Sequence, residues 1–233
     1  MKTPDHTATA EKEFSKYHNR LRSELNNANW HFAICKYIRS IRKDHLHELN
    51  QAPAFFGLTI DAHLLSTLMR MNKFFDRKQE HLSIRNFLDF VEENLDIFSN
   101  EAFAKRLRQQ GRYDAYFVQG HAEVAPDKVE QDREKVNRLP VSHIRAWRNK
   151  ILAHIETASV LSDIDIMKAY PVKSGQIDDV INTLHAMLND YSVAYDGITW
   201  EKDLALEHGI QTIVDAIRFE SQQRRKALKS LSI

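Results

Sequence analysis

Apolar side chains recur with the period of an α-helix along most of the chain. The clearest case runs from residue 177 to 195, where they fall at i, i+3, i+4 and i+7, and Gly197 follows at a position where helices commonly end. The same period predicts further helices over about 10–26, 30–41, 54–76, 84–95 and 204–228. Helical spacing therefore accounts for most of the sequence.

Polar and helix-breaking residues indicate where these helices begin and end. Ser83 precedes one apolar face and Ser99 or Asn100 precedes the next, so these side chains are candidate N-caps. Pro53 is expected to end the stretch that carries the apolar positions of 30–41, and Pro140 is expected to open a helix that follows the charged run 127–138. The alternating signs of that run are typical of a solvated helix face.

Other stretches predict departures from regular helix. We expect the residues through Thr9 to be frayed and the asparagines within 26–29 to bend the chain. We expect irregular connections at 111–127 and 159–175, the latter separating the core from the C-terminal helices. The segment 54–76 is apolar nearly all round, which predicts a central helix.

Glycine and proline are scarce, with six and five copies in 233 residues. β proteins need many turns, so this scarcity favours long helices joined by few loops. We predict an all-α fold, an up-and-down helical bundle with additional N- and C-terminal helices, because no internal repeat of fixed period suggests a solenoid. A single domain over 1–233 is expected, with its core at about 28–158 and its C-terminal helices at about 174–229.

Charge and cysteine content narrow the function classes. The formal net charge is +1, so any contact with nucleic acid must come from a local patch rather than from a strongly basic domain. Cys35 is the only cysteine, which excludes a disulfide framework and a closed thiolate zinc site. The polar start of the chain lacks the apolar run of a signal peptide, and no stretch is long enough for a membrane span, so we expect a cytoplasmic protein.

Three histidines and the basic end of the last helix can be explained without a functional site. His45 and His47 point about 200° apart on a regular helix, so we interpret them as solvated side chains. His63 is interpreted as a packed core histidine rather than a ligand. The basic end of the helix over 204–228 either docks phosphates or simply complements the helix dipole.

The most informative stretch is Ile144 to Glu156, which places basic side chains, an amide and a histidine on one predicted helix. Arg148 and His154 lie roughly 120° apart around that helix. They converge on one ligand only if the helix bends or if a symmetry mate supplies a second copy of the pair. A site of this kind favours an assembly of several chains.

The chemistry of these groups suits RNA. Imidazole titrates near neutrality, so His154 can accept a proton from a ribose 2′-hydroxyl or donate one to a leaving 5′-oxygen. The guanidinium of Arg148 can stabilise the charge of a five-coordinate phosphorus. Asn149, Lys150 and Arg145 are candidates for binding substrate, and no step needs a metal or another cofactor. The competing interpretation is that Arg148 and His154 bond only to acidic neighbours or to backbone carbonyls.

The sequence Arg148-Asn149-x-x-x-Ala153-His154 resembles the signature of the HEPN superfamily, an arginine, a polar residue and then a histidine. The segment Phe55 to Phe98, with F-F-G-L-T-I-D-A-H-L-L, R-M-N-K-F-F-D-R and L-S-I-R-N-F-L, is similar to the AbiU-type abortive-infection branch. The resemblance implies a HEPN-like helical bundle that dimerises and cleaves RNA without metal at the dimer cleft. Five residues separate arginine from histidine here, whereas four is the commonest spacing in the family.

Two function classes follow. The first is a metal-independent endoribonuclease of a phage-defence, abortive-infection or toxin type, for which an antitoxin protein is a candidate partner. The second is a catalytically silent HEPN module that binds RNA, nucleotide or a protein partner through the same cleft. A metalloenzyme is a distant third, since the sequence has no HExxH motif.

Overall fold

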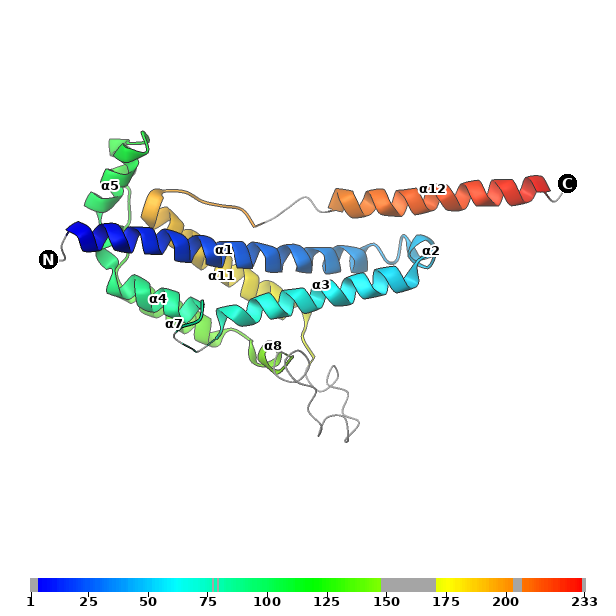
Figure 1. Ribbon diagram of the computed structural model, residues 1–233, viewed down its shortest axis with the longest axis horizontal. Coiled ribbons are helices and arrows are strands. Elements are labelled where there is room, and N and C mark those ends of the chain that lie inside the picture. The colour runs from blue at the N-terminus through cyan, green and yellow to red at the C-terminus, as the bar shows by residue number, and fades with distance from the viewer. Residues whose placement is uncertain (1–3, 77, 79, 148–170, 203–206, 232–233) are drawn as a thin grey trace. The chain divides into compact units, whose positions relative to one another are not determined.

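The computed structural model describes residues 4–76, 78, 80–147, 171–202 and 207–231. In this part of the chain the regular structure is helical throughout, which confirms the predicted all-α fold (Figure 1). The α-helices are α1 (Pro4–Ser40), α2 (Leu46–Leu49), α3 (Pro53–Phe74), α4 (Ile84–Glu93), α5 (Asn100–Gln109), α6 (Ala115–Gln119), α7 (Pro126–Arg138), α8 (Ser142–Trp147), α11 (Ser174–Asp196) and α12 (Glu207–Leu231), with a 3-10 helix η1 (Leu95–Phe98) after α4.

The predicted helix boundaries at two serines and one glycine are confirmed. The Ser83 side chain accepts a hydrogen bond from the Asn86 backbone at 3.2 Å, and Ser99 accepts one from Ala102 at 3.2 Å. Each serine thereby satisfies an N–H group that the first turn of a helix leaves open. Gly197 ends α11 in the left-handed conformation, with φ of 70°, which only glycine adopts without strain.

Two predicted irregularities are wrong at the start of the chain. Helix α1 already begins at Pro4, where proline is well tolerated in a first turn, and it continues unbroken through the asparagines of 26–29 to Ser40. The apolar face explains this continuity, because Leu25, Ala28 and Phe32 are all fully buried. Burial of that face outweighs the weak helix propensity of asparagine.

The expected irregular connection at 111–127 also differs from the structure. It contains the short helix α6, which Asp114 caps by accepting a hydrogen bond from the Tyr116 backbone at 2.7 Å, and α7 already begins at Pro126. Asp114 is a strong N-cap residue that a purely periodic analysis overlooks.

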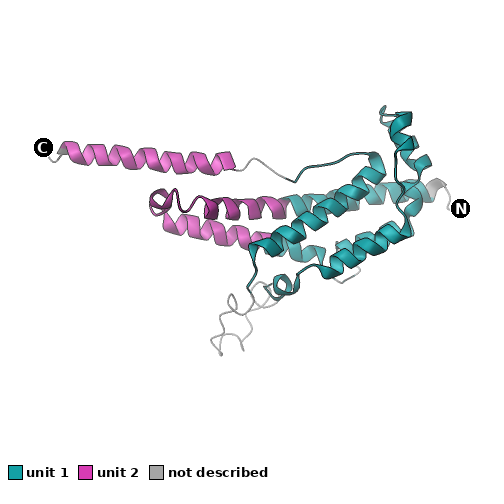
Figure 2. Ribbon diagram, turned by 180° about the vertical axis from the view of Figure 1, so that it is seen from behind, with its two compact units in different colours: residues 1–26, 68–202 teal, residues 27–67, 203–233 magenta. Residues whose placement is uncertain are grey.

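The chain forms two compact units (Figure 2). The first comprises residues 1–26 and 68–202, and the second comprises residues 27–67 and 203–233. Helices α1 and α3 contribute residues to both units. The single domain with a core at about 28–158 stays a prediction.

Aromatic side chains form the centre of the first unit. Phe14 of α1 meets Phe98 of η1 edge to face, with ring centres 5.1 Å apart, and Tyr195 of α11 at 4.5 Å. Phe87 of α4 packs against Tyr191 of α11 at 5.4 Å. Such aromatic pairs join α1 and α11, which are far apart in the sequence, to each other and to α4 and η1.

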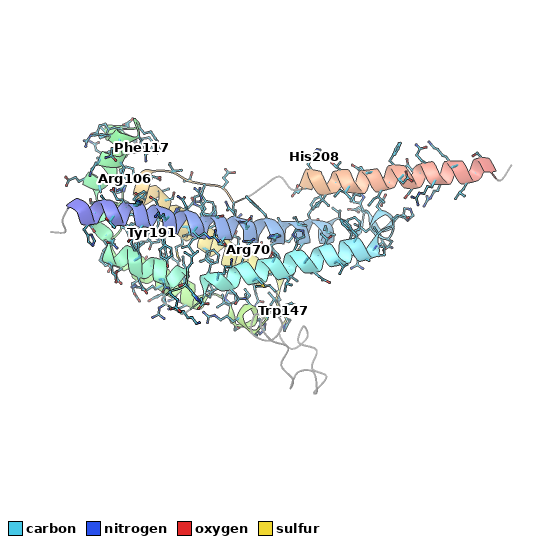
Figure 3. The ribbon with its side chains drawn as sticks, viewed as in Figure 1. Arg70, Arg106, Phe117, Trp147, Tyr191 and His208 are labelled. Carbon is cyan, nitrogen blue, oxygen red and sulfur yellow. The ribbon has the colours of Figure 1, made fainter. Side chains whose placement is uncertain are left out.

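Two of the buried charged side chains in this unit are those of Asp132 and Arg106. Asp132 of α7 is fully buried, and its carboxylate accepts hydrogen bonds from the Tyr191 hydroxyl at 3.0 Å and from Lys135 at 2.9 Å, with Lys128 as a third partner. Burial, reinforced by the neighbouring Asp132 charge, raises the pKa of Tyr191, which therefore stays a hydrogen-bond donor. Arg106 of α5 is the second buried charge, and Figure 3 shows it and Tyr191 among the packed helices.

The second unit has its own apolar cluster, made of Ile38, Leu49 and Phe56, against which Ile210 and Ile217 of α12 pack. Polar contacts reinforce this packing. Arg218 of α12 donates to Glu48 at 2.8 Å and to His45 Nδ1 at 2.7 Å, whereas Arg225 donates to His47 Nε2 at 3.0 Å.

These contacts change the interpretation of the basic helix end and of the two histidines. His45 and His47 are not merely solvated, because each accepts a hydrogen bond from an arginine of α12. The same contacts give Arg218 and Arg225 a structural role, which favours the non-phosphate interpretation of this helix end.

Helix α3, predicted to be central because it is apolar nearly all round, is buried on one side only. Phe56, Leu68 and Phe74 are buried, but Phe55 and Leu58 on the other side are 55% and 69% exposed. Neighbouring helices therefore cover only part of the apolar surface of α3. No helix in the described ranges is long and apolar enough to cross a membrane.

We expect Tyr191→Phe to lower the free energy of unfolding by about 1.5–3 kcal/mol, the usual range for a hydrogen bond to a charged group. The ring and its packing remain, so the loss reports on the bond to Asp132. Urea unfolding followed by circular dichroism measures the effect. Tyr116→Phe is the control, because Tyr116 is 83% exposed; equal effects of the two substitutions would contradict the assigned role.

Candidate functional site

Helix α8, Ser142–Trp147, is the described part of the predicted motif helix. It starts two residues after Pro140 and buries Ile144 and Trp147, the latter labelled in Figure 3. Four predicted site residues, Arg148, Asn149, Lys150 and His154, lie outside the described residues. Arg145 is the predicted site residue that the structure places.

A buried amide of α3 fixes α8. Asn72 is 5% exposed, and its Nδ2 donates to the Leu68 carbonyl at 2.9 Å and to the Ile144 carbonyl at 3.0 Å. The first bond keeps the side chain against its own helix, and the second reaches α8, which lies beside the C-terminal half of α3 in Figure 1. Asn72 therefore provides a hydrogen-bond donor to the backbone carbonyl of Ile144, a buried residue of α8.

Arg145 adds a second connection between α8 and the end of α3. Its Nη2 donates to the Phe75 carbonyl at 3.4 Å, and its guanidinium lies 5.9 Å from the centre of the Phe75 ring. A cation near a helix C-terminus is favourable because the last carbonyls carry partial negative charge. Part of the role of Arg145 is thus structural, in addition to the charge that it supplies to the surface.

His143 connects the two ends of the span 148–170. Its Nδ1 donates to the Pro171 carbonyl at 2.7 Å, and Pro171 is the first described residue after that span. The contact therefore holds Pro171 against α8.

The end of α3 is also fixed to α1 through charges. Glu24 is 4% exposed and binds Arg70 at 2.8 Å and Lys73 at 3.2 Å. Burial opposes ionisation of Glu24, but the hydrogen bond from Lys73 and the surrounding cations outweigh it and lower the pKa of this carboxyl. Glu24 thus stays ionised at neutral pH and holds the helix that carries Asn72.

A cavity of about 300 Å³ lies where α3 and α8 meet α4 and α7. Its polar lining comes from Arg85 of α4, Asn137 of α7, Arg145 of α8 and Asp76 after α3. Apolar residues close its floor, namely Phe74, Phe75, Ile84, Val136 and Val141. Two arginines thus face one concave surface beside α8.

A larger cavity of about 610 Å³ lies elsewhere in the first unit, and its described lining comes mainly from α5, α6, α7, α11 and the connection between α6 and α7. His121 stacks on Phe103 there, with ring centres 4.0 Å apart, and donates to the Ala194 carbonyl at 2.8 Å. That histidine is committed to structural contacts. The mainly apolar lining offers no arrangement for acid-base chemistry.

The described residues include no group of three or more histidine, cysteine, aspartate or glutamate side chains arranged to hold a metal ion. His63 is half-buried, and its Nδ1 lies 2.7 Å from Nδ1 of His31 in the second unit. Only one of these two nitrogens can carry the shared proton, and burial lowers the pKa of His63. The interpretation of His63 as a packed histidine fits this pairing.

Two residues of this region were missed by reasoning from the sequence. Asn72 lies at helical spacing from the apolar residues Leu68 and Phe75, and a single polar residue on an apolar face is a signal for an inter-helix bond. Arg85 lies in the first turn of α4, where acidic residues are the favoured ones, so its charge is unusual at that position.

Comparison with known proteins identifies one family. The family model AbiU2, a HEPN family, matches residues 11–215, which include both the segment 55–98 and the motif Arg148 to His154. No curated protein and no solved structure matches the chain.

We expect Asn72→Ala to lower the free energy of unfolding by about 1–3 kcal/mol, because the Ile144 carbonyl loses its buried donor. Urea unfolding provides the measurement. Asn19→Ala is the matched control: Asn19 is exposed on α1, so its replacement should change the stability by less than about 0.5 kcal/mol. Equal stability of Asn72→Ala and the control would show that this amide does not fix α8.

Proposed function

The chain belongs to the AbiU2 family of HEPN proteins, and from that premise we propose that it is a metal-independent endoribonuclease of a phage-defence, abortive-infection or toxin type. The observation that carries the proposal is the coincidence of the family match with the Arg148-Asn149-x-x-x-Ala153-His154 sequence, which lies inside the matched range. Both lead to an RNA-directed site on the segment that follows α8.

In this proposal His154 moves the protons and Arg148 stabilises charge. The 2′-hydroxyl loses its proton to imidazole and its oxygen attacks the adjacent phosphorus, while the bond to the 5′-oxygen breaks. The leaving 5′-oxygen takes up a proton, and the products are a 2′,3′-cyclic phosphate and a 5′-hydroxyl. Arg148 forks onto the phosphoryl oxygens as negative charge develops on them.

Asn149, Lys150 and Arg145 are proposed to bind substrate. An amide can donate to a phosphate oxygen, and the two cations attract the RNA backbone. The connections of α8 support this assignment, since Asn72 and the His143 contact hold the chain on either side of the segment. A catalytic group needs such fixed surroundings to keep its geometry.

The alternative is a catalytically silent HEPN module that binds RNA, nucleotide or a protein partner such as an antitoxin. The spacing of five residues between Arg148 and His154 favours it, because the commonest family form has four. The two functions differ in whether RNA is cut, so a cleavage assay separates them.

We expect the purified protein to cleave mixed RNA in the presence of EDTA, and Arg148→Ala and His154→Ala each to lower the rate by on the order of 10² or more. Asn149→Ala should cost less. The controls are Arg224→Ala and His208→Ala, because both side chains are exposed on α12. Gel electrophoresis with end-group analysis should find cyclic phosphates, and RNA methylated at the 2′-oxygen of the scission site should resist. Activity that needs magnesium, or that survives in His154→Ala, refutes the mechanism.

We expect a homodimer at micromolar concentration, because Arg148 and His154 diverge on a regular helix and two copies bring the groups together. Light scattering measures the mass. If each site draws its arginine and its histidine from different chains, mixing Arg148→Ala with His154→Ala protein should restore about a quarter of the wild-type activity, since half the dimers then hold one intact site. A protein that is monomeric throughout speaks against a shared site.

A further inference from the structure

Four helices meet at the cavity of about 300 Å³ beside α8, and the charges around it are unequal. Arg85 and Arg145 are the basic lining residues, and Asp76 is the acidic one. The Asp76 carboxylate is already engaged, since Oδ1 accepts from the Lys78 backbone at 3.1 Å and Oδ2 lies 3.0 Å from His81 Nδ1. The lining therefore places two guanidinium groups beside one carboxylate that has other hydrogen-bonding partners.

Arg85 differs from the arginine beside it in having no acidic partner. Arg133 of α7 lines the neighbouring cavity together with Arg85, but it binds Asp89 at 2.7 Å, Glu92 at 2.7 Å and Glu130 at 3.5 Å. Arg85 is exposed, and its side chain makes neither an ion pair nor a hydrogen bond with any other described residue. The charge of Arg85 is thus unused by the fold.

The start of α4 adds to the positive potential. Arg85 is the second residue of this helix of ten residues, and its first turn holds no acidic residue. The N-terminal N–H groups carry partial positive charge, which favours an anion and disfavours a cation. An arginine here lowers the stability of the helix slightly unless an anion binds nearby.

From these observations we propose that Arg85, Arg145 and the Asn137 amide form an oxyanion subsite that binds one phosphate group of the RNA backbone. This inference rests on the proposed function, because it supplies that site with a phosphate contact from α4 and α7, outside the motif. Arg145 stands three positions before Arg148 in the sequence, so the subsite adjoins the segment that carries the reaction. Phosphate contacts of this kind fix the position of a strand without reading its bases.

The test compares Arg85→Gln with Arg138→Gln in the His154→Ala background, which removes cleavage. Both substitutions delete one charge; Arg138 lies next to Asn137 on α7 but is 79% exposed, pairs with Glu134 and does not line the cavity. Fluorescence anisotropy with a single-stranded RNA oligonucleotide, over a series of salt concentrations, gives the affinity. We expect Arg85→Gln to weaken binding roughly tenfold and to reduce the salt slope by about 0.7, and Arg138→Gln to change little.

A second arm uses inorganic phosphate as the probe and the side-chain amide signals of Asn137 in nuclear magnetic resonance spectra as the readout. Saturable shifts of the Asn137 signals in the His154→Ala protein that vanish when Arg85→Gln is added support the anion subsite. If the same protein binds no RNA, the proposed function fails and the anion subsite stands. Equal weakening of RNA binding by Arg85→Gln and Arg138→Gln would contradict the subsite. Asn137 signals that do not change when phosphate is added to the RNA-free protein would contradict it as well.

Discussion

The guanidinium of Arg106 is the polar contact on which the first unit most depends. It donates to the Tyr195 carbonyl at 2.7 Å, to Glu11 at 2.7 Å and to the Ile97 carbonyl at 2.6 Å, and it lies 4.1 Å from the centre of the Tyr195 ring. One side chain of α5 thus joins α11, α1 and η1. Burying this charge is costly unless its N–H groups find acceptors, so the three helical elements must adopt one arrangement around it. Apolar packing alone would tolerate several.

The same reasoning extends to α8, where a neutral amide takes the place of the charge. Most helical stability in a folded protein comes from tertiary packing of a buried face. Burial of Ile144 and Trp147 supplies the attraction, and Asn72 fixes the position along α3 by its bond to one particular carbonyl. The His143 contact then brings Pro171 back to α8. Segment 148–170 is therefore bounded by polar contacts that are each specific to one atom.

The period of the apolar residues predicted the helices well where one face is buried, as in α11. The caps Ser83, Ser99 and Gly197 were predicted well from residue type, because capping depends on local chemistry. Periodicity failed where the outcome depends on partners distant in the sequence. Helix α1 passes through its asparagines because a long apolar face is buried, and α3 leaves Phe55 exposed because too few neighbours cover it. Of the site residues, Arg145 was identified from its place in the motif, whereas Asn72 and Arg85 act through spatial neighbours that no spacing rule reveals.

A protein with a net charge near zero can still have a charged surface patch. Exposed charges act over only about a Debye length, roughly 8–10 Å at physiological salt, so distant charges do not cancel the patch. The two arginines of α4 and α7 illustrate this. Arg133 is neutralised by three carboxylates and stabilises the pairing of its helices, whereas Arg85 keeps its charge at a helix end that already disfavours cations. A sequence that breaks a local rule without a compensating contact commonly does so for function. The net charge of +1 therefore does not describe the surface beside α8, where Arg85 and Arg145 line one cavity.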